Sequence, residues 1–225
     1  MESEELQRRY RAGERDFSGL NLREIELTNL TLEAIDLSRA DLRQARLGKI
    51  HLARSILRST DFSESILWGA DLSEADLTGA LLRDADLSGA NLTKANLETA
   101  YLVKAVLNGV NLNGASLRGA KLLDADFRPT SDQRTDLGKT DFRDADLNYA
   151  IFSGASLYRA NLEGSRLCRA NFSARPARDA FLTDLTGANF RGADLSYADF
   201  SGAILRDADL TGADLTGTML AEAIF

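Results

Sequence analysis

Residues 69–92 read GADLSEADLTGALLRDADLSGANL, and within this stretch a leucine recurs at every fifth position. The same spacing of Leu or Phe continues through residues 17–127, 137–172 and 185–225, which gives forty such positions that we call centres. A period of five fits neither an α-helix nor a plain strand, so each repeat must join a short extended segment to a turn. The chain is therefore predicted to be a solenoid of stacked repeats.

The other positions of the repeat indicate which side chains are buried. The residue two before a centre is small, most often Ala, and the residue one before it is most often Asp or Asn. Alternation along an extended segment turns the centre and the small residue inward together and the Asp or Asn outward. A Gly often stands two after the centre and permits the turn. One repeat cannot bury its own centre, but stacked repeats bury a continuous core.

The resulting pattern, A-(D/N)-L-x-G, resembles that of the pentapeptide-repeat family over residues 15–225. The resemblance implies an all-β fold, a right-handed quadrilateral β-helix with four repeats per coil and hence about ten coils. Less regular stretches are similar to a cyanobacterial member of that family that controls heterocyst differentiation: REIELTN (23–29), DLRQARLGK (41–49), ILWGADLSEADL (66–77), SDQRTDLG (131–138) and SRLCRANF (165–172). This similarity implies a non-catalytic, protein-binding regulatory scaffold that controls cell differentiation through a regulatory protein.

The two ends of the chain differ. Residues 1–14 lack the period and are predicted to form a short helix, with Ser3 as its N-cap, that covers the first coil of a β-helix spanning 15–225. At the other end the repeats continue to Phe225 with no polar cap. An uncovered coil leaves open strand edges. We expect either a homodimer through the uncapped C-terminal coil or a frayed last coil.

Two segments, 128–136 and 173–184, interrupt the period. In the first, Asp132 occupies the place of a centre, and in the second Leu182 competes with Leu185 as the next centre. Both segments are predicted to be exposed loops. Loops on a rigid scaffold are where binding residues concentrate.

Nothing in the pattern favours catalysis or a cofactor. Columns of Asp and Asn could in principle bind a metal, but the same residue type along the whole chain indicates a requirement of the fold. His51 and Cys168 are the only residues of their kinds, and both stand at outward positions. We therefore expect no enzyme activity, no metal and no cofactor.

Charge and hydropathy limit the classes of partner that the chain is expected to bind. The net charge is −7, and the C-terminal end is acidic, which disfavours direct nucleic-acid binding because that needs a basic stripe. No stretch is long and apolar enough for a membrane span, and the first residues do not look like a secretory signal. A cytoplasmic location is the default expectation.

Several outward positions that should be polar are apolar. With four repeats per coil, residues twenty apart lie directly above one another, and reading the chain this way gathers an apolar patch with basic neighbours on two adjacent faces, which continues into the first loop. The predicted protein-binding residues are Ile66, Trp68, Leu81, Tyr101, Val103, Lys104, Val106, Lys121, Leu123, Arg128, Asp132 and Arg134. Other outward apolar residues are more scattered and are not assigned to the site: Tyr149, Ile151, Tyr158 and Tyr197.

Two alternatives remain at this point. The apolar residues could only stabilise the stacking of neighbouring coils and bind nothing. The acidic end and the open Phe225 also fit a second function known in the family, a DNA mimic that modulates a topoisomerase such as gyrase, although 27 basic residues argue against a uniformly DNA-like surface.

Overall fold

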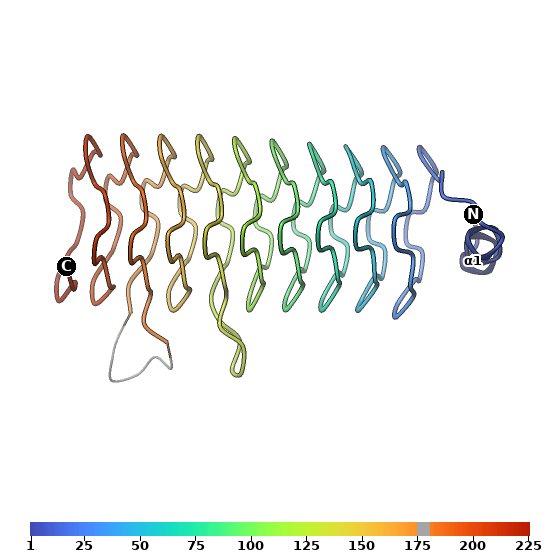
Figure 1. Cartoon of the computed structure of the whole chain (residues 1–225), viewed down its shortest axis with the longest axis horizontal. Helices are drawn as coiled ribbons and strands as arrows, with labels where there is room; N and C mark the ends of the chain where they lie inside the picture. Colours follow the sequence, from blue (N-terminus) through green and yellow to red (C-terminus); the bar gives the residue numbers. More distant parts are fainter. Residues whose placement is uncertain (175–180) are drawn as a thin grey trace.

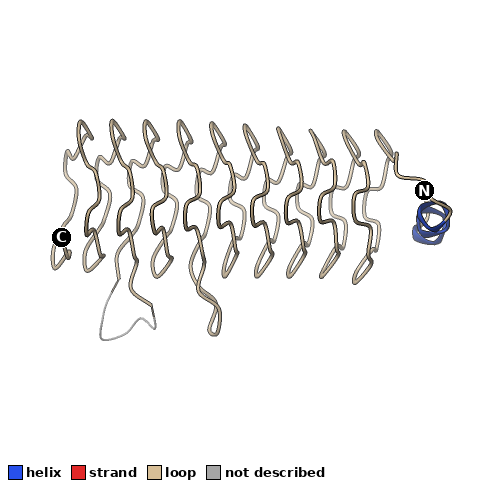
Figure 2. Cartoon of the chain, viewed as in Figure 1, coloured by secondary structure: helices blue, strands red, loops and turns tan. Residues whose placement is uncertain are grey.

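A computed structural model describes residues 1–174 and 181–225, and it shows a rod of stacked coils with a single helix at the N-terminal end (Figure 1). The helix α1 spans Ser3–Arg11. The rest of the described chain forms no strand long enough to be drawn as one, so Figure 2 shows the coils as loops. Four columns of single-residue parallel bridges run along the rod instead. Each column has ten members, so the predicted quadrilateral β-helix of about ten coils is confirmed.

We number the coils 1 to 10 from the N-terminal end and the faces 1 to 4 in chain order. Coil 1 holds the centres Phe17, Leu22, Leu27 and Leu32, one on each face. Bridged residues are twenty apart, as in Leu81 with Tyr101. Across the two interruptions the offset grows to 25 and 28 residues, in the pairs Asn111–Asp136 and Ser156–Asp184. The first insertion therefore adds five residues and the second eight, and both leave the corner between faces 3 and 4.

Backbone hydrogen bonds satisfy most of the N–H groups of each repeat. The N–H of centre Leu82 donates to Tyr101 O in the next coil at 2.7 Å, and the N–H of Ala85 donates to Leu82 O across the turn at 3.2 Å. The N–H groups one before and two after the centre also pair with neighbouring coils. In the interior coils the N–H one after the centre finds no backbone acceptor within the described chain. Each buried or half-buried N–H needs a partner, so this group must be satisfied by a side chain or by water.

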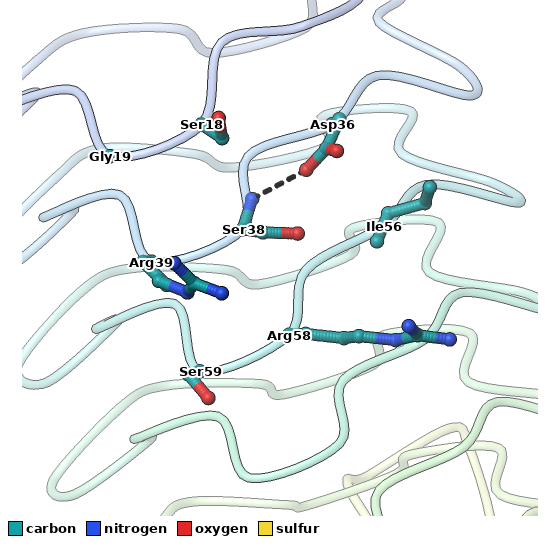
Figure 3. Close-up of a pocket in the computed structure, with 8 residues that line it drawn as sticks. All are labelled: Ser18, Gly19, Asp36, Ser38, Arg39, Ile56, Arg58 and Ser59. Atoms are coloured by element: carbon teal, nitrogen blue, oxygen red, sulfur yellow. Dashed lines mark hydrogen bonds between the residues drawn. The ribbon is translucent and has the colours of Figure 1, made fainter.

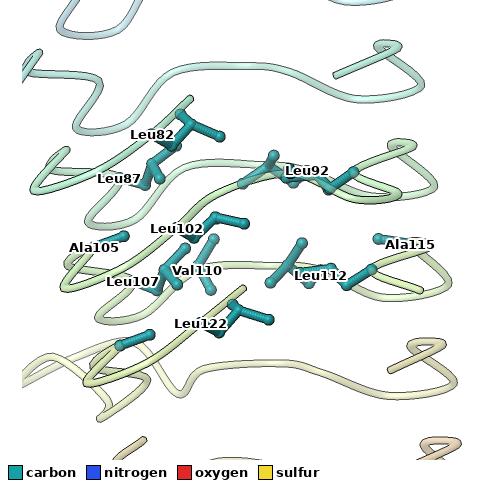
Figure 4. Packing of buried hydrophobic residues seen from close by; sticks show 14 of the residues in the cluster. Leu82, Leu87, Leu92, Leu102, Ala105, Leu107, Val110, Leu112, Ala115 and Leu122 are labelled. Carbon is teal, nitrogen blue, oxygen red and sulfur yellow. The ribbon is translucent and has the colours of Figure 1, made fainter. Parts of the chain in front are cut away.

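The core is a column of centres and small residues (Figure 4). The centres of coils 1–9 are buried, and the Ala two before many of them is buried beside them. On face 3, Phe127, Phe152, Phe172 and Phe200 form one stack with ring centroids 4.8, 4.7 and 4.6 Å apart. Hydroxyls at the small position bond to carbonyls, as Thr60 Oγ1 donates to Leu37 O at 2.7 Å.

The helix closes the N-terminal end as expected, with one correction. Leu6 is fully buried, Tyr10 packs against the core, and the Tyr10 hydroxyl donates to Glu33 O at 2.9 Å. The N-cap is Glu2, so the prediction of Ser3 was wrong. Ser3 already lies inside the helix, where its hydroxyl accepts a hydrogen bond from the Gln7 side chain at 3.2 Å.

The last coil is less covered than the others. Its centres Leu210, Leu215, Leu220 and Phe225 are partly or fully exposed, and Phe225 reaches 68 % exposure. A homodimer through this coil stays a prediction.

Candidate protein-binding surface

The recurring Asp or Asn has a structural role. Its side-chain oxygen accepts the N–H one after the centre, which has no backbone acceptor. Asp71 Oδ1 accepts from Ser73 N at 3.0 Å, and Asn111 Oδ1 accepts from Asn113 N at 3.0 Å. We call this contact the repeat cap. It explains the columns of outward carboxylates and amides as a requirement of the fold.

Arginines on the faces often neutralise these carboxylates. Arg43 pairs with Asp41 and Arg143 with Asp141, both at 2.6 Å. The hydrogen bond from Arg143 holds the pKa of Asp141 below its usual value. Part of the polar surface is therefore occupied by contacts within the chain.

The repeat cap is missing in the predicted patch. On face 2 the capping position holds Leu81, Tyr101 and Lys121 in coils 4 to 6, and these three are bridged to one another in order. Within the described chain the N–H groups of Arg83 and Val103 have no protein acceptor. Leu81 is 36 % and Tyr101 48 % exposed. At these two positions the repeat cap is therefore replaced by exposed apolar side chains.

The neighbouring face shows the same departure in alternate coils. Ile66 and Val106 replace the capping residue on face 3, and both are exposed. Trp68 is exposed on one side only, because its ring covers Gly48, where an added Cβ would come within 2.6 Å of the indole nitrogen. Lys49 Nζ lies 4.9 Å from the centre of the same ring. Trp68 thus has a packing role in addition to any contact with a partner.

Three basic residues stand around the patch. Arg83, Lys104 and Lys121 make no ion pair within residues 1–174 and 181–225. Val103 and Leu123 are half-buried between them. Lys104 stands at a corner, with a positive φ of 58°. The predicted residues of faces 2 and 3 lie in neighbouring coils, with Asp84 and Asp124 at the same corner position as Lys104.

The predicted residues of the first loop have partners inside the chain. Arg128 pairs with Asp126 at 2.6 Å, and this hydrogen bond raises the pKa of Arg128. Asp132 accepts the hydroxyl of Thr130 at 3.0 Å. Both residues stabilise the loop and its root.

Arg134 joins the two insertions. Its Nε donates to Gly154 O at 3.1 Å, and its Nη2 donates to Ala155 O at 3.2 Å and to Leu182 O at 2.5 Å. Burial lowers the pKa of Arg134. The guanidinium also lies 5.8 Å from the ring of Phe181. Arg134, predicted from the sequence as a partner contact, thus binds backbone carbonyls of its own chain.

Glycines at the corner make room for these loops. A Cβ on Gly109 would meet Thr130 at 3.0 Å, and one on Gly154 would meet Pro129 at 3.0 Å and Phe181 O at 3.2 Å. The next centre after the second insertion is Leu185, which is buried, whereas Leu182 is only half-buried. Residues 175–180 of the predicted loop 173–184 lie outside the described residues.

One depression, His51 and Cys168 lie outside the predicted protein-binding residues. An open depression of about 540 Å³ near the N-terminal end is lined by Ser18, Ser38, Arg39, Ile56, Arg58 and Ser59, with Gly19 and Asp36 (Figure 3). Its Asp36 carboxylate accepts the N–H of Ser38 at 2.8 Å, as the dashed line shows (Figure 3). His51 is exposed and Cys168 half-buried, both at outward positions. In the described part of the chain no three His, Cys, Asp or Glu side chains gather as metal ligands, and no helix there could span a membrane.

Comparison with known proteins agrees with this architecture. The family described as Pentapeptide repeats matches eight copies, over residues 35–71, 70–109, 95–128, 135–173 and 183–224. The crystal structure of HetL, a pentapeptide repeat protein involved in heterocyst differentiation regulation from the cyanobacterium Nostoc sp. strain PCC 7120, is 55 % identical with a TM-score of 0.97. The match covers 100 % of this chain and 94 % of HetL. No curated protein matches the chain.

Two further solved structures are more distant. QnrB1, a plasmid-mediated fluoroquinolone resistance protein, is 24 % identical, with 86 % of this chain and 91 % of QnrB1 covered and a TM-score of 0.42. Rfr23 from the cyanobacterium Cyanothece 51142 is 28 % identical, with 58 % and 97 % covered and a TM-score of 0.38. These TM-scores are too low to bear on function. The repeats, the register of twenty and the similarity to HetL together show that this chain belongs to the pentapeptide-repeat family.

Proposed function

We propose that this protein is a non-catalytic scaffold that controls heterocyst-type cell differentiation by binding a regulatory protein through the apolar surface of faces 2 and 3. The observation that carries the proposal is the stack of Leu81 and Tyr101, where two adjacent coils give up the repeat cap and expose apolar side chains. A contiguous apolar patch on a polar surface is typical of a protein contact site. The similarity to HetL, which is involved in heterocyst differentiation regulation, supports the biological context.

Within the twelve predicted residues, the structure supports a division of roles. Leu81, Tyr101 and Val103 supply the apolar centre, and Lys104 and Lys121 supply charge beside it. Tyr and apolar side chains in the middle of an interface, with charged residues around them, are the usual arrangement of binding hot spots. Ile66, Trp68, Val106 and Leu123 extend this surface. Arg128, Asp132 and Arg134 position the first loop beside it.

The test replaces apolar residues at the capping position with the residue type that the repeat uses there. A double variant, Leu81→Asn with Tyr101→Asn, restores the capping residue type and removes the apolar centre. Ile56→Asn is the matched control, because Ile56 is an exposed apolar residue at the same position of the repeat on face 1. Each full-length protein is immobilised and used to purify partners from a heterocyst-forming cyanobacterium, and each is also expressed in its filaments. We expect the double variant alone to lose a specific partner and its effect on heterocyst frequency.

Two outcomes would contradict the proposed binding surface. If the double variant recovers the same partner with the same affinity, measured by calorimetry with the purified protein, the surface of faces 2 and 3 is not the binding site. Retention of the effect on heterocyst frequency by that variant would lead to the same conclusion.

Other parts of the expected function are separate proposals. A DNA-mimicking action on gyrase is supported by the net charge of −5 over residues 181–225, and absence of any effect on gyrase supercoiling at micromolar protein would exclude it. A homodimer through the last coil is supported by the exposed Phe225, and sedimentation velocity tests it. The cytoplasmic location predicted from the sequence stays a prediction.

A further inference from the structure

A second group of side chains lies at the corner between faces 2 and 3, in coils 7 to 9. Tyr149, Arg169 and Tyr197 occupy the same corner position in successive coils. The N–H of Tyr149 donates to Cys168 O at 3.0 Å and the N–H of Arg169 to Ser196 O at 2.9 Å, which fixes this order. The guanidinium carbon of Arg169 lies 5.9 Å from the ring centre of Tyr149 and 5.8 Å from that of Tyr197. The arginine therefore lies between two aromatic rings, within the range of a cation–π contact with each.

The tyrosines stand where the fold disfavours them. The corner position requires a positive φ, which is 61° at Tyr149 and 58° at Tyr197, and in the described chain these are the only aromatic residues with a positive φ. Bulky side chains rarely adopt this conformation, and residues kept in it against their preference concentrate at functional sites. Both rings are well exposed, at 46 % and 54 %. Neither burial nor backbone preference explains their presence.

The backbone beneath the group is shaped to accept it. The same corner of coil 10 holds Gly217, where an added Cβ would come within 2.7 Å of the Tyr197 ring. Tyr197 is thus packed between Gly217 on one side and Arg169 on the other. This packing restrains the ring that faces the guanidinium.

The guanidinium of Arg169 makes no ion pair in the described chain, and the acids of the adjoining faces have contacts of their own. Asp146 pairs with Arg166 at 2.6 Å. Asp194 and Asp199 accept the N–H groups one after their centres, at 3.0 and 2.9 Å. Arg169 is exposed, so the N–H edge of its guanidinium is available to a ligand. A planar guanidinium held in a fixed orientation suits a carboxylate, which it binds with two parallel hydrogen bonds.

We propose that Tyr149, Arg169 and Tyr197 form a carboxylate-recognition site that takes a Glu or Asp side chain from an acidic segment of a partner protein. Arg169 binds the two carboxylate oxygens. The tyrosine rings fix the guanidinium, and their edges pack against the aliphatic part of the incoming side chain. The site is separate from the apolar surface of coils 3 to 6 and does not depend on the function proposed for that surface.

The experiment follows the Nε–Hε NMR signals of arginine in the full-length protein during titration with a peptide of ten glutamates. Arg39 is a matched internal control, because it is exposed, has a corner φ of 58° and makes no ion pair in the described chain, but has Gly19 and Ser59 above and below it. We expect the Arg169 signal to saturate at a peptide concentration at least ten-fold lower than the Arg39 signal. A peptide of ten glutamines should leave both signals unchanged.

Variants separate recognition from folding. Tyr149→Gly with Tyr197→Gly introduces the residue that this fold already uses at the corner, so the rod should remain folded, and binding at Arg169 should weaken at least ten-fold. Arg169→Lys, observed through the backbone amide of residue 169, should weaken it similarly because an ammonium cannot make the paired contact. Leu81→Asn with Tyr101→Asn should bind the peptide as the unmodified protein does, so that this test and that of the apolar surface can fail independently.

Three results would overturn the proposal. Equal saturation of Arg169 and Arg39 would show that the flanking rings add nothing. Unchanged binding in the tyrosine double variant would lead to the same conclusion. Tighter binding of inorganic phosphate, or of an oligothymidylate, than of the glutamate peptide would assign the site to a phosphate group.

Discussion

Replacing Leu81 and Tyr101 with Asn should leave the stability of the rod almost unchanged. Each Asn can accept the N–H one after its centre, as Asn111 does at 3.0 Å, and a hydrogen bond of this kind contributes about 0.5–1.5 kcal/mol, or about 1–3 kcal/mol for the pair. Against this, Leu81 and Tyr101 are only partly out of water, at 36 % and 48 % exposure, so their removal costs about 2–3 kcal/mol together. The two effects nearly cancel.

The assay is thermal unfolding followed by circular dichroism, with urea unfolding as a second measurement. For a chain of this length 1 kcal/mol corresponds to about 2–4 °C, so the double variant should melt within about 4 °C of the unmodified protein. Ile56→Asn, at 41 % exposure on another face, should behave in the same way. A fall of about 8 °C or more in the double variant would refute the reasoning, because it would mean that the apolar pair mainly stabilises the stacking of coils.

Three further predictions concern the rest of the rod. Arg134→Ala removes three hydrogen bonds from a half-buried guanidinium and should lower the free energy of unfolding by about 2–3 kcal/mol, with Arg134→Lys recovering less than half in the same urea titration. Phe152→Ala removes an inner ring of the face 3 stack and should cost about 3–5 kcal/mol, whereas Phe152→Leu should cost much less; equal costs would show that the stack is not tightly packed. Because Arg143 lowers the pKa of Asp141 in the folded state, this carboxylate stabilises the rod above its unfolded pKa of about 4 and loses that contribution as the pH falls further. Melting curves from pH 7 to pH 2 should therefore drop less steeply for Asp141→Asn, and an unchanged slope would contradict this assignment.

The sequence was sufficient for the fold because one period determines almost every position. Burial of Leu82, its small neighbour at Ala80 and the vertical alignment of Leu81 with Tyr101 all follow from counting by five and by twenty. The exposed patch was located in the same way. Periodicity carries this information because each repeat contacts only its neighbours in the stack.

Side-chain hydrogen bonds could not be predicted in this way. Arg134 was assigned to a partner because a loop arginine is usually exposed, but its guanidinium reaches one carbonyl of the second insertion, 48 residues away, and two carbonyls of coil 7. Tyr149 and Tyr197 were treated as scattered because the second insertion shifts the count by eight residues and hides their alignment. The available signal was their shared place two after a centre, where an aromatic residue is out of character for the repeat.

The corner between faces 3 and 4 has further value as a site for changes in chain length. Five extra residues leave the rod there in coil 6 and eight leave it in coil 8, yet Phe127, Phe152, Phe172 and Phe200 still stack at regular spacing across both. Insertions of different length at this corner therefore leave the stacking register of the coils unchanged, and we expect the corner to accept new sequence in the same way. A foreign peptide inserted after Gly69 in coil 3, away from the contacts that Gly154 makes with both natural insertions, would leave the rod at the same corner.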